Sequence, residues 1–362
     1  MRWRVSSSDG VHGRIGSRYD GQMAAPSCAF RRLALVTVLA TFCLIVLGGV
    51  VRVSDSGLGC GPGGSGFHGW PLCRGDVVPG LDLNAIIEYA HRVTASLVGL
   101  AILALAALAW RASRRGGGAH PRLVRASLAA AALVIGQGLL GAATVEGNLD
   151  EALVATHLGL AMLLLALVLY IWRGSRPDVI GAPPSDGGRG FRPLAQAAQA
   201  ALLAAIVAGG YMAGTQHYGR ADYQLGDGAH HACGKEFPTC NGELLPFGQA
   251  QLVDIHLAHR VLMSVATLLL VALVVLALRR RPSAGVVRSA LVTLALLVAQ
   301  LLLGALNVWL DEYEALIVAH LTVATLLWAT LAGLILQLYE VPAAAARRPT
   351  QRVAQATTAV AA

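Results

Sequence analysis

The sequence contains few charged residues, and its first 30 residues contain no long apolar run. Of its 362 residues, 13% are charged and 56% are hydrophobic, whereas soluble domains average about 25% charged residues. This excludes an ordinary soluble protein and predicts an integral membrane protein. The first 30 residues lack the apolar core of a signal peptide, so we expect the first span to be retained as an anchor. Met23 is a second candidate for the translation start.

Long apolar runs are present instead, and a run of about 20 residues is long enough to cross a bilayer as a helix. Eight such runs occur, at residues 33–52, 85–110, 124–145, 152–172, 194–215, 253–278, 287–310 and 314–338. They predict an all-α integral membrane protein with eight transmembrane helices embedded in the lipid bilayer.

The charged residues between the runs indicate the orientation, because Lys and Arg near span ends favour the cytoplasmic side. The basic residues that share one side are Arg31, Arg32, Arg111, Arg114, Arg115, Arg122, Arg125, Arg173, Arg176, Arg189, Arg192, Arg279, Arg280, Arg281, Arg288, Arg347, Arg348 and Arg352. The loops on the opposite side are acidic. We therefore expect a plasma-membrane (cell-membrane) protein with both termini cytoplasmic and its cysteine-containing loops outside. The net charge of +8 follows from this topology and does not indicate nucleic acid.

The chain also repeats internally. Residues 136–145 match residues 299–308, and residues 151–158 match residues 314–321. Because each copy has an even number of spans, the repeat predicts two tandem pseudo-symmetric four-helix bundles related by an axis along the membrane normal. The predicted units are a tail (1–32), a first half (33–172), a linker without a packed core (173–193), a second half (194–338) and a second tail (339–362).

Four histidines occupy equivalent positions in the repeat, namely His91, His157, His259 and His320. A single histidine on an apolar helix is more often a packing residue, but four in register indicate ligands. Zinc prefers three or four protein ligands, with carboxylate or thiolate among them. Two imidazoles per half better suit the two faces of a porphyrin, so haem is the predicted cofactor.

Three further charged residues lie beside these histidines. Arg92 and Arg260 are candidate contacts for haem propionates, and the alternative is an interfacial arginine whose head group reaches water. Glu88 lies one helical turn before His91 and on the same face. A carboxylate inside an apolar span predicts a functional role. Its alternative is an ion pair with Arg92 at the four-residue spacing.

Cysteines occur in pairs in two of the outer loops. Cys60 and Cys73 share the first outer loop, and Cys233 and Cys240 share the third. Both loops face the predicted oxidising side, where disulfides persist. Each pair is read as a structural disulfide, with reactive thiol exchange as the alternative. The remaining two, Cys28 and Cys43, are expected to be inert.

Several of these stretches together resemble the haem A synthase family. They are Gly48-Gly-Val-Val-Arg52-Val-Ser-Asp-Ser-Gly57-Leu-Gly-Cys60, Trp70-Pro-Leu-Cys73-Arg-Gly, Glu88-Tyr-Ala-His91-Arg92 and Cys233-Gly-Lys-Glu-Phe-Pro-Thr-Cys240-Asn-Gly. The resemblance extends over residues 33–338. It implies an oxidoreductase acting on a CH group, which oxidises the C8 methyl group of haem O to a formyl group and so makes haem A for terminal oxidases.

The resemblance also implies roles for particular residues and partners. His91 and His157 would hold the substrate haem, His259 and His320 would hold haem b, and Glu88 would be the catalytic carboxylate. The implied partners are haem O synthase, a farnesyltransferase, and the terminal oxidase assembly. The sequence identifies neither the electron acceptor nor whether the protein is a homo-oligomer.

One segment departs from the family pattern, and two other functions remain open. A glycine-rich insert at residues 61–69 precedes Trp70, and its His68 has no assigned role. We expect the insert to let the two cysteines meet, because glycine restricts the backbone little. A dihaem membrane cytochrome that exchanges electrons with quinone would use the same histidines but would not need Glu88. A transporter would explain the repeat but not the register of the histidines.

Overall fold

The computed structural model describes residues 26–114, 121–180, 182–215, 228–310 and 313–340. Met23 and most of the two predicted tails lie outside these residues. Eight helices in the described part are long and apolar enough to cross a membrane. They are α1 (Cys28–Val53), α2 (Leu83–Arg114), α3 (Pro121–Glu146), α4 (Glu151–Gly174), α5 (Phe191–Gly214), α6 (Gln251–Arg280), α7 (Ala284–Trp309) and α8 (Glu314–Gln337).

These helices confirm the predicted fold class. The other helical elements of the described residues are two short 3-10 helices, η1 (Gly66–His68) and η2 (Ala229–His231), and no strand occurs among them. Every long helix begins and ends within five residues of the predicted span. Two helices run past their apolar part into arginines, with Arg111 and Arg114 in the last turn of α2 and Arg279 and Arg280 in that of α6. Positive charge there complements the helix dipole.

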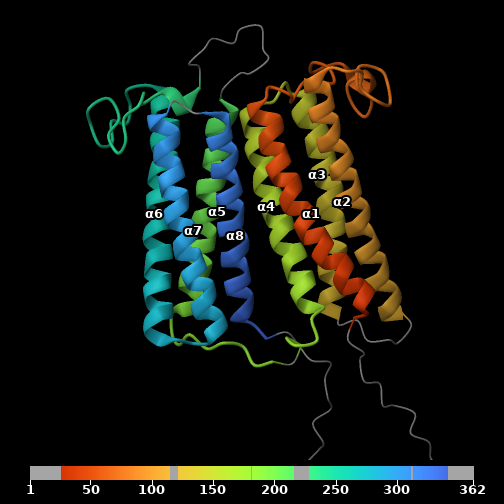
Figure 1. Ribbon diagram of the computed structural model, residues 1–362, viewed down its shortest axis with the longest axis vertical. Helices are drawn as coiled ribbons and strands as arrows, with labels where there is room; N and C mark the ends of the chain where they lie inside the picture. The colour runs from red at the N-terminus through yellow and green to blue at the C-terminus, as the bar shows by residue number, and fades with distance from the viewer. Residues whose placement is uncertain (1–25, 115–120, 181, 216–227, 311–312, 341–362) are drawn as a thin grey trace, which may run out of the picture.

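The helices form two groups, which Figure 1 shows side by side. In the first, α1 contacts α2, α2 contacts α3, α3 contacts α4, and α4 closes the ring on α1. Helices α5, α6, α7 and α8 contact one another in the same cyclic order. Within each ring, α2 and α4, or α6 and α8, therefore stand at opposite corners. The predicted symmetry axis between the halves stays a prediction.

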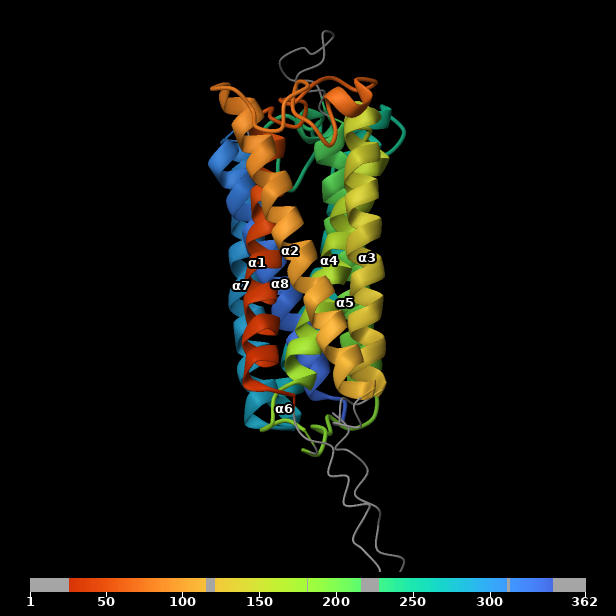
Figure 2. The same ribbon diagram turned by 90° about the vertical axis from the view of Figure 1, so that its right-hand side faces the viewer.

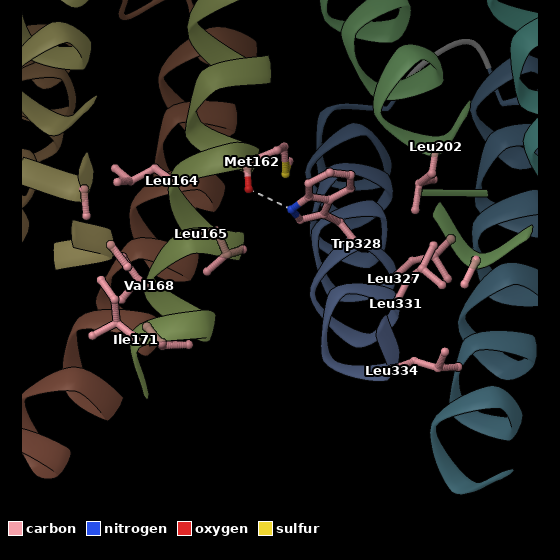
Figure 3. Close-up of a cluster of buried hydrophobic side chains, with 14 of the residues drawn as sticks. Met162, Leu164, Leu165, Val168, Ile171, Leu202, Leu327, Trp328, Leu331 and Leu334 are labelled. Atoms are coloured by element: carbon pink, nitrogen blue, oxygen red, sulfur yellow. Dashed lines mark hydrogen bonds between the residues drawn. The ribbon is translucent and has the colours of Figure 1, made fainter. Parts of the chain in front are cut away.

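The two groups pack on each other through α4 and α5, α1 and α8, and α4 and α8. At the centre of this contact, the indole Nε1 of Trp328 on α8 donates a hydrogen bond of 2.7 Å to the carbonyl of Met162 on α4. Figure 3 shows the indole pointing from α8 toward that carbonyl, and both side chains are buried. Arg52 at the end of α1 donates to the carbonyl of Ala213 on α5 at 2.7 Å. The halves are therefore joined by specific bonds as well as by apolar packing.

The long helices run along one axis, so the connections gather at two ends (Figures 1 and 2). We call the end that carries residues 54–82 and 228–250 the disulfide end. The opposite end, the linker end, carries residues 175–180 and 182–190, the start of α1 and the end of α8.

The predicted linker, expected to have no packed core of its own, is attached to the second half by hydrogen bonds. The backbone N–H of Ser185 donates to the carbonyl of Gln337 at 3.0 Å, and Arg280 donates to the carbonyl of Gly187 at 2.7 Å. Phe191, at the end of the predicted linker, begins α5 and is fully buried. The Pro- and Gly-rich linker leaves carbonyl groups without helical partners, and Arg280 donates to two of them, those of Gly187 and Arg189.

The outward faces of the helices are apolar. The exposed leucines along them include Leu97, Leu100, Leu139, Leu268 and Leu302. A soluble protein would not expose so many large apolar side chains on long helices, whereas lipid accommodates them. The outward faces therefore agree with a multi-pass membrane protein.

Candidate functional site

The four histidines predicted as ligands lie on the even-numbered helices, in the part nearer the disulfide end. His91 is on α2, His157 on α4, His259 on α6 and His320 on α8. His91 and His157 are close enough to interact electrostatically, as are His259 and His320. Because the paired helices stand at opposite corners of a ring, each half contains one histidine pair that faces its interior.

A glycine on the preceding odd-numbered helix makes room for each histidine ring. A methyl group added to Gly48 would lie 3.2 Å from Cε1 of His91. Equivalent additions lie against Cε1 of the other rings, at 3.4 Å for Gly141 and His157, 3.0 Å for Gly209 and His259, and 3.2 Å for Gly304 and His320. All four rings therefore sit close to a neighbouring helix backbone, and a larger residue would push most of them away.

The ring nitrogens show what the pairs can bind. The Nδ1 atoms of His91, His157 and His320 are buried and have no hydrogen-bond partner among the described residues. Nδ1 of His259 donates a hydrogen bond to the carbonyl of Ala205 at 3.0 Å. Its Nε2 therefore carries the lone pair that can coordinate a metal. Buried ring nitrogens without a partner are costly unless a ligand uses the ring.

The donor set suits haem better than a metal ion held by protein alone. Within the described ranges, His, Cys, Asp and Glu side chains form no cluster of three or more that could hold a metal ion. Two imidazoles in a bundle interior are the usual arrangement for a bis-histidine haem. The residues present therefore fit the predicted haem in each half.

Glu88 joins the first histidine helix to the first outer loop. Its carboxylate is buried, accepts a hydrogen bond of 2.7 Å from the backbone N–H of Cys60, and is ion-paired with Arg92. The ion pair with Arg92, which is the alternative to a catalytic role for Glu88, is therefore present. His256, the counterpart in the second half, is also buried, and its Nδ1 donates to the carbonyl of Ala229 at 2.9 Å. The two halves thus use a carboxylate and an imidazole for similar attachments to their loops.

Arg92 and Arg260 hold the disulfide loops by the same contact. Arg92 donates to the carbonyls of Gly69 and Leu72 at 2.6 and 3.1 Å, and Leu72 directly precedes Cys73. Arg260 donates to the carbonyls of Glu236, Pro238 and Thr239, and Thr239 directly precedes Cys240. Both guanidinium groups thus donate hydrogen bonds to carbonyls of the outer loops. The propionate contacts stay a prediction.

Both cysteine pairs form disulfides, Cys60 with Cys73 and Cys233 with Cys240, which confirms the predicted pairing. Residues 70–76 and 237–243 also share a turn. Positions 74 and 75 have φ of 54° and 87°, and positions 241 and 242 have φ of 51° and 82°. Two successive positive φ angles are the pattern of a type I′ hairpin turn. The internal repeat therefore extends into the outer loops.

The glycine-rich insert at residues 61–69 is attached to the second outer loop. The N–H of Gly63 donates to Oδ1 of Asn148 at 3.0 Å, and that of Gly64 donates to the carboxylate of Glu146 at 2.9 Å. The insert contains η1 and permits the disulfide, as expected. His68 lies against Gly75, where an added methyl group would be 3.1 Å from its Nδ1.

Several residues beside the histidines were not predicted from the sequence. Gly209 and Gly210 repeat Gly48 and Gly49 at the corresponding place in the second half, and this doublet is a signal that could have been found. Gln300 lies 2.9 Å from Nε2 of His320 through its side-chain nitrogen. Its repeat counterpart Gln137 donates to the carbonyl of His157 at 3.0 Å. Both glutamines lie within the matched segments but were not singled out.

These features define a multi-pass α-helical membrane protein with one histidine pair and one disulfide-bonded loop in each half. The chain belongs to the family described as cytochrome oxidase assembly protein, whose sequence model matches residues 82–332. The resemblance indicated by the motifs is thereby confirmed.

Proteins named "Heme A synthase" are similar over most of the chain. The one from Alkalihalophilus pseudofirmus is 30% identical over 305 residues, which are 82% of this chain and 93% of the relative. The one from Halalkalibacterium halodurans is 33% identical over 66% of this chain and 72% of the relative. The one from Symbiobacterium thermophilum is 32% identical over 77% and 85%. These matches do not favour a dihaem cytochrome.

Proposed function

We propose that the protein is a haem A synthase, which oxidises the C8 methyl group of haem O to a formyl group. The reaction adds one oxygen atom from water and removes four electrons and four protons, and the electrons pass to an external acceptor. The observation that carries the proposal is the set of four glycine-seated histidines in a chain whose relatives carry that name.

The two histidine pairs take different roles in this proposal. His91 and His157 bind the substrate haem O, and His259 and His320 bind haem b. Haem b, when bound, supplies a one-electron redox centre. The assignment is supported by the difference between Glu88 and His256, since the first half alone has a carboxylate one helical turn from its histidine.

Glu88 is the catalytic carboxylate in this proposal. Oxidation of a methyl group develops positive charge on the carbon, and a fixed negative charge nearby stabilises that transition state. The bonds from Cys60 and Arg92 hold the Glu88 carboxylate in one position. The carboxylate is also a candidate acceptor for the proton of the attacking water.

The location and partners follow from the same assignment. Arginines at the linker end, such as Arg173, Arg280 and Arg288, favour the cytoplasm, so the disulfide end would face the outside of the cell membrane. Haem O would come from the farnesyltransferase haem O synthase, and haem A would go to terminal oxidase assembly.

The proposal is tested by producing the chain in a bacterial host that makes haem O but no haem A. Extracted haems are then separated and identified by mass. We expect haem A with the unsubstituted chain and none with a His157→Ala variant of equal abundance. Membranes that contain the folded protein and abundant haem O, but no haem A, would contradict the proposed activity.

A further inference from the structure

The two halves meet at a close crossing of α4 and α5 that is built on glycine. A methyl group added to Gly214 would lie 2.7 Å from Cα of Glu151, and one added to Gly210 would lie 2.9 Å from Cδ2 of Leu158 and 3.5 Å from Cα of Ala155. From the α4 side, a methyl group on Gly159 would lie 2.8 Å from Cγ2 of Val207. Two glycines four residues apart let helix backbones approach closely inside a membrane.

This crossing connects one histidine of the first half with one of the second. On α4, Leu158 follows His157 of the first half. On α5, Gly210 follows Gly209, which is in tight contact with His259 of the second half. A continuous series of packed groups therefore runs from one pair to the other, and it contains no long flexible side chain besides Leu158.

The corresponding contact between α1 and α8 is looser. A methyl group added to Gly49 would meet Leu321, the residue after His320, at 2.5 Å from Cδ2, and its other near contact is Cγ at 3.8 Å. The position four residues further along α1 is Val53 rather than glycine. On the α8 side, only the side-chain end of Leu321 meets the added methyl group, and it can change rotamer. On the α4 side, backbone atoms of Glu151 and Ala155 meet α5, and they cannot move in that way.

We propose that Gly210 is a positioning residue, because the α4–α5 crossing at Gly210 and Gly214 fixes His157 of the first half relative to His259 of the second. The proposal rests on the proposed function for its purpose, since electron exchange between substrate and cofactor needs a constant arrangement of the two sites. The coupling between the two histidines is a property of the protein itself and does not require bound haem. A change on one side of the crossing should alter the histidine of the other half, His157 on α4 or His259 on α6.

The experiment uses haem-free full-length protein with ¹³C-labelled histidine, and ring resonances are assigned through His157→Gln and His259→Gln. Gly210→Ala on α5 should shift the His157 resonance on α4. Leu158→Ala on α4 should shift the resonance of His259, which lies on α6 against Gly209 of α5. The matched control is Gly333→Ala, because a methyl group there meets no atom within 4 Å. It should shift neither resonance.

Leu158→Ala only removes atoms, so it tests the crossing even if Gly210→Ala does not fold. Unchanged His259 in folded Leu158→Ala, or unchanged His157 in folded Gly210→Ala, would overturn the proposal. Because these resonances are read without haem, the coupling can fail while haem A is still made. Equally, the coupling can hold in a protein that makes no haem A.

Discussion

The carboxylate of Glu88 accepts a hydrogen bond of 2.7 Å from the backbone N–H of Cys60. One helical turn along α2 stands His91, so a single helix connects a disulfide-bonded outer loop to a proposed haem ligand. Arg92 strengthens this connection, because it binds both Glu88 and the loop carbonyl of Leu72. The first outer loop is therefore bonded directly to the helix that carries His91.

The first prediction concerns the charge of Glu88. Glu88→Gln keeps the shape and can still accept the Cys60 N–H, but it removes the negative charge. We expect normal binding of haem O and a loss of haem A formation of about 100-fold or more, as for other groups that stabilise charge or accept protons in a transition state. The hydroxylated haem should accumulate, which mass analysis of extracted haems detects.

The control for this prediction is Glu314→Gln, at the exposed start of α8, which should leave haem A formation unchanged. Haem A formation at the unsubstituted level by Glu88→Gln would remove the catalytic role. Glu88 would then be a structural ion-pair partner of Arg92.

A second prediction concerns the seat of a histidine. Gly209→Ala places a methyl group 3.0 Å from Cε1 of His259, so the ring must move and haem b retention should fall. Alanine favours a helix by about 1 kcal/mol over glycine, so weaker helix formation does not explain such a loss. Haem b is measured by absorbance per protein after purification.

The control for the seat is Gly138→Ala, because an added methyl group there meets nothing within 4 Å. This variant should retain haem b fully. Equal retention of haem b by Gly209→Ala would contradict the account of the glycine seats.

A third prediction counts thiols. The chain has six cysteines, of which Cys28 and Cys43 are free and the other four form disulfides. Alkylation of denatured, unreduced protein should therefore add two labels per chain, and prior reduction should raise the number to six. Mass spectrometry of the intact chain gives both counts. Labelling of Cys60 or Cys73 before reduction would mean that the first pair is open in the purified protein.

A fourth prediction concerns the loop contacts of Arg260. The side chain is buried and donates to three loop carbonyls. Hydrogen bonds from a charged group contribute about 1.5–3 kcal/mol each, so Arg260→Met should lower the unfolding free energy by about 3 kcal/mol. Arg176→Met breaks the exposed pair with Asp178 and the cation–π contact with Trp172, and should cost about 1 kcal/mol. Equal thermal unfolding of the two variants would contradict the role of Arg260.

Local sequence signals predicted much of this fold and site. Spanning helices follow from apolar length, which depends on neighbouring residues alone, and the internal repeat placed the four histidines in register. The four-residue spacing indicated an ion pair of Glu88 with Arg92 as the alternative to a catalytic role, and that ion pair is present. The bond of Glu88 to Cys60 was not predicted, because it joins residues that only the folded loop brings together.

The contacts between the two halves could not be predicted from the sequence either. The bond from Trp328 to Met162 and the seating of Leu158 on Gly210 depend on how two bundles pack, and no spacing within one helix encodes that. The glycines can be read from the sequence, but glycine is common in transmembrane helices. Which residue of a neighbouring helix packs on each glycine is known only from the fold.

The central claim is that the two histidine pairs bind different haems, and haem content after single substitutions tests it most directly. His91→Ala and His157→Ala should lose bound haem O and retain haem b. His259→Ala and His320→Ala should lose haem b and, with it, haem A formation. Haem extraction and quantification from equal amounts of each purified variant gives the answer. Normal haem b in both second-half variants, or loss of haem b instead of haem O in the first-half variants, would contradict the account.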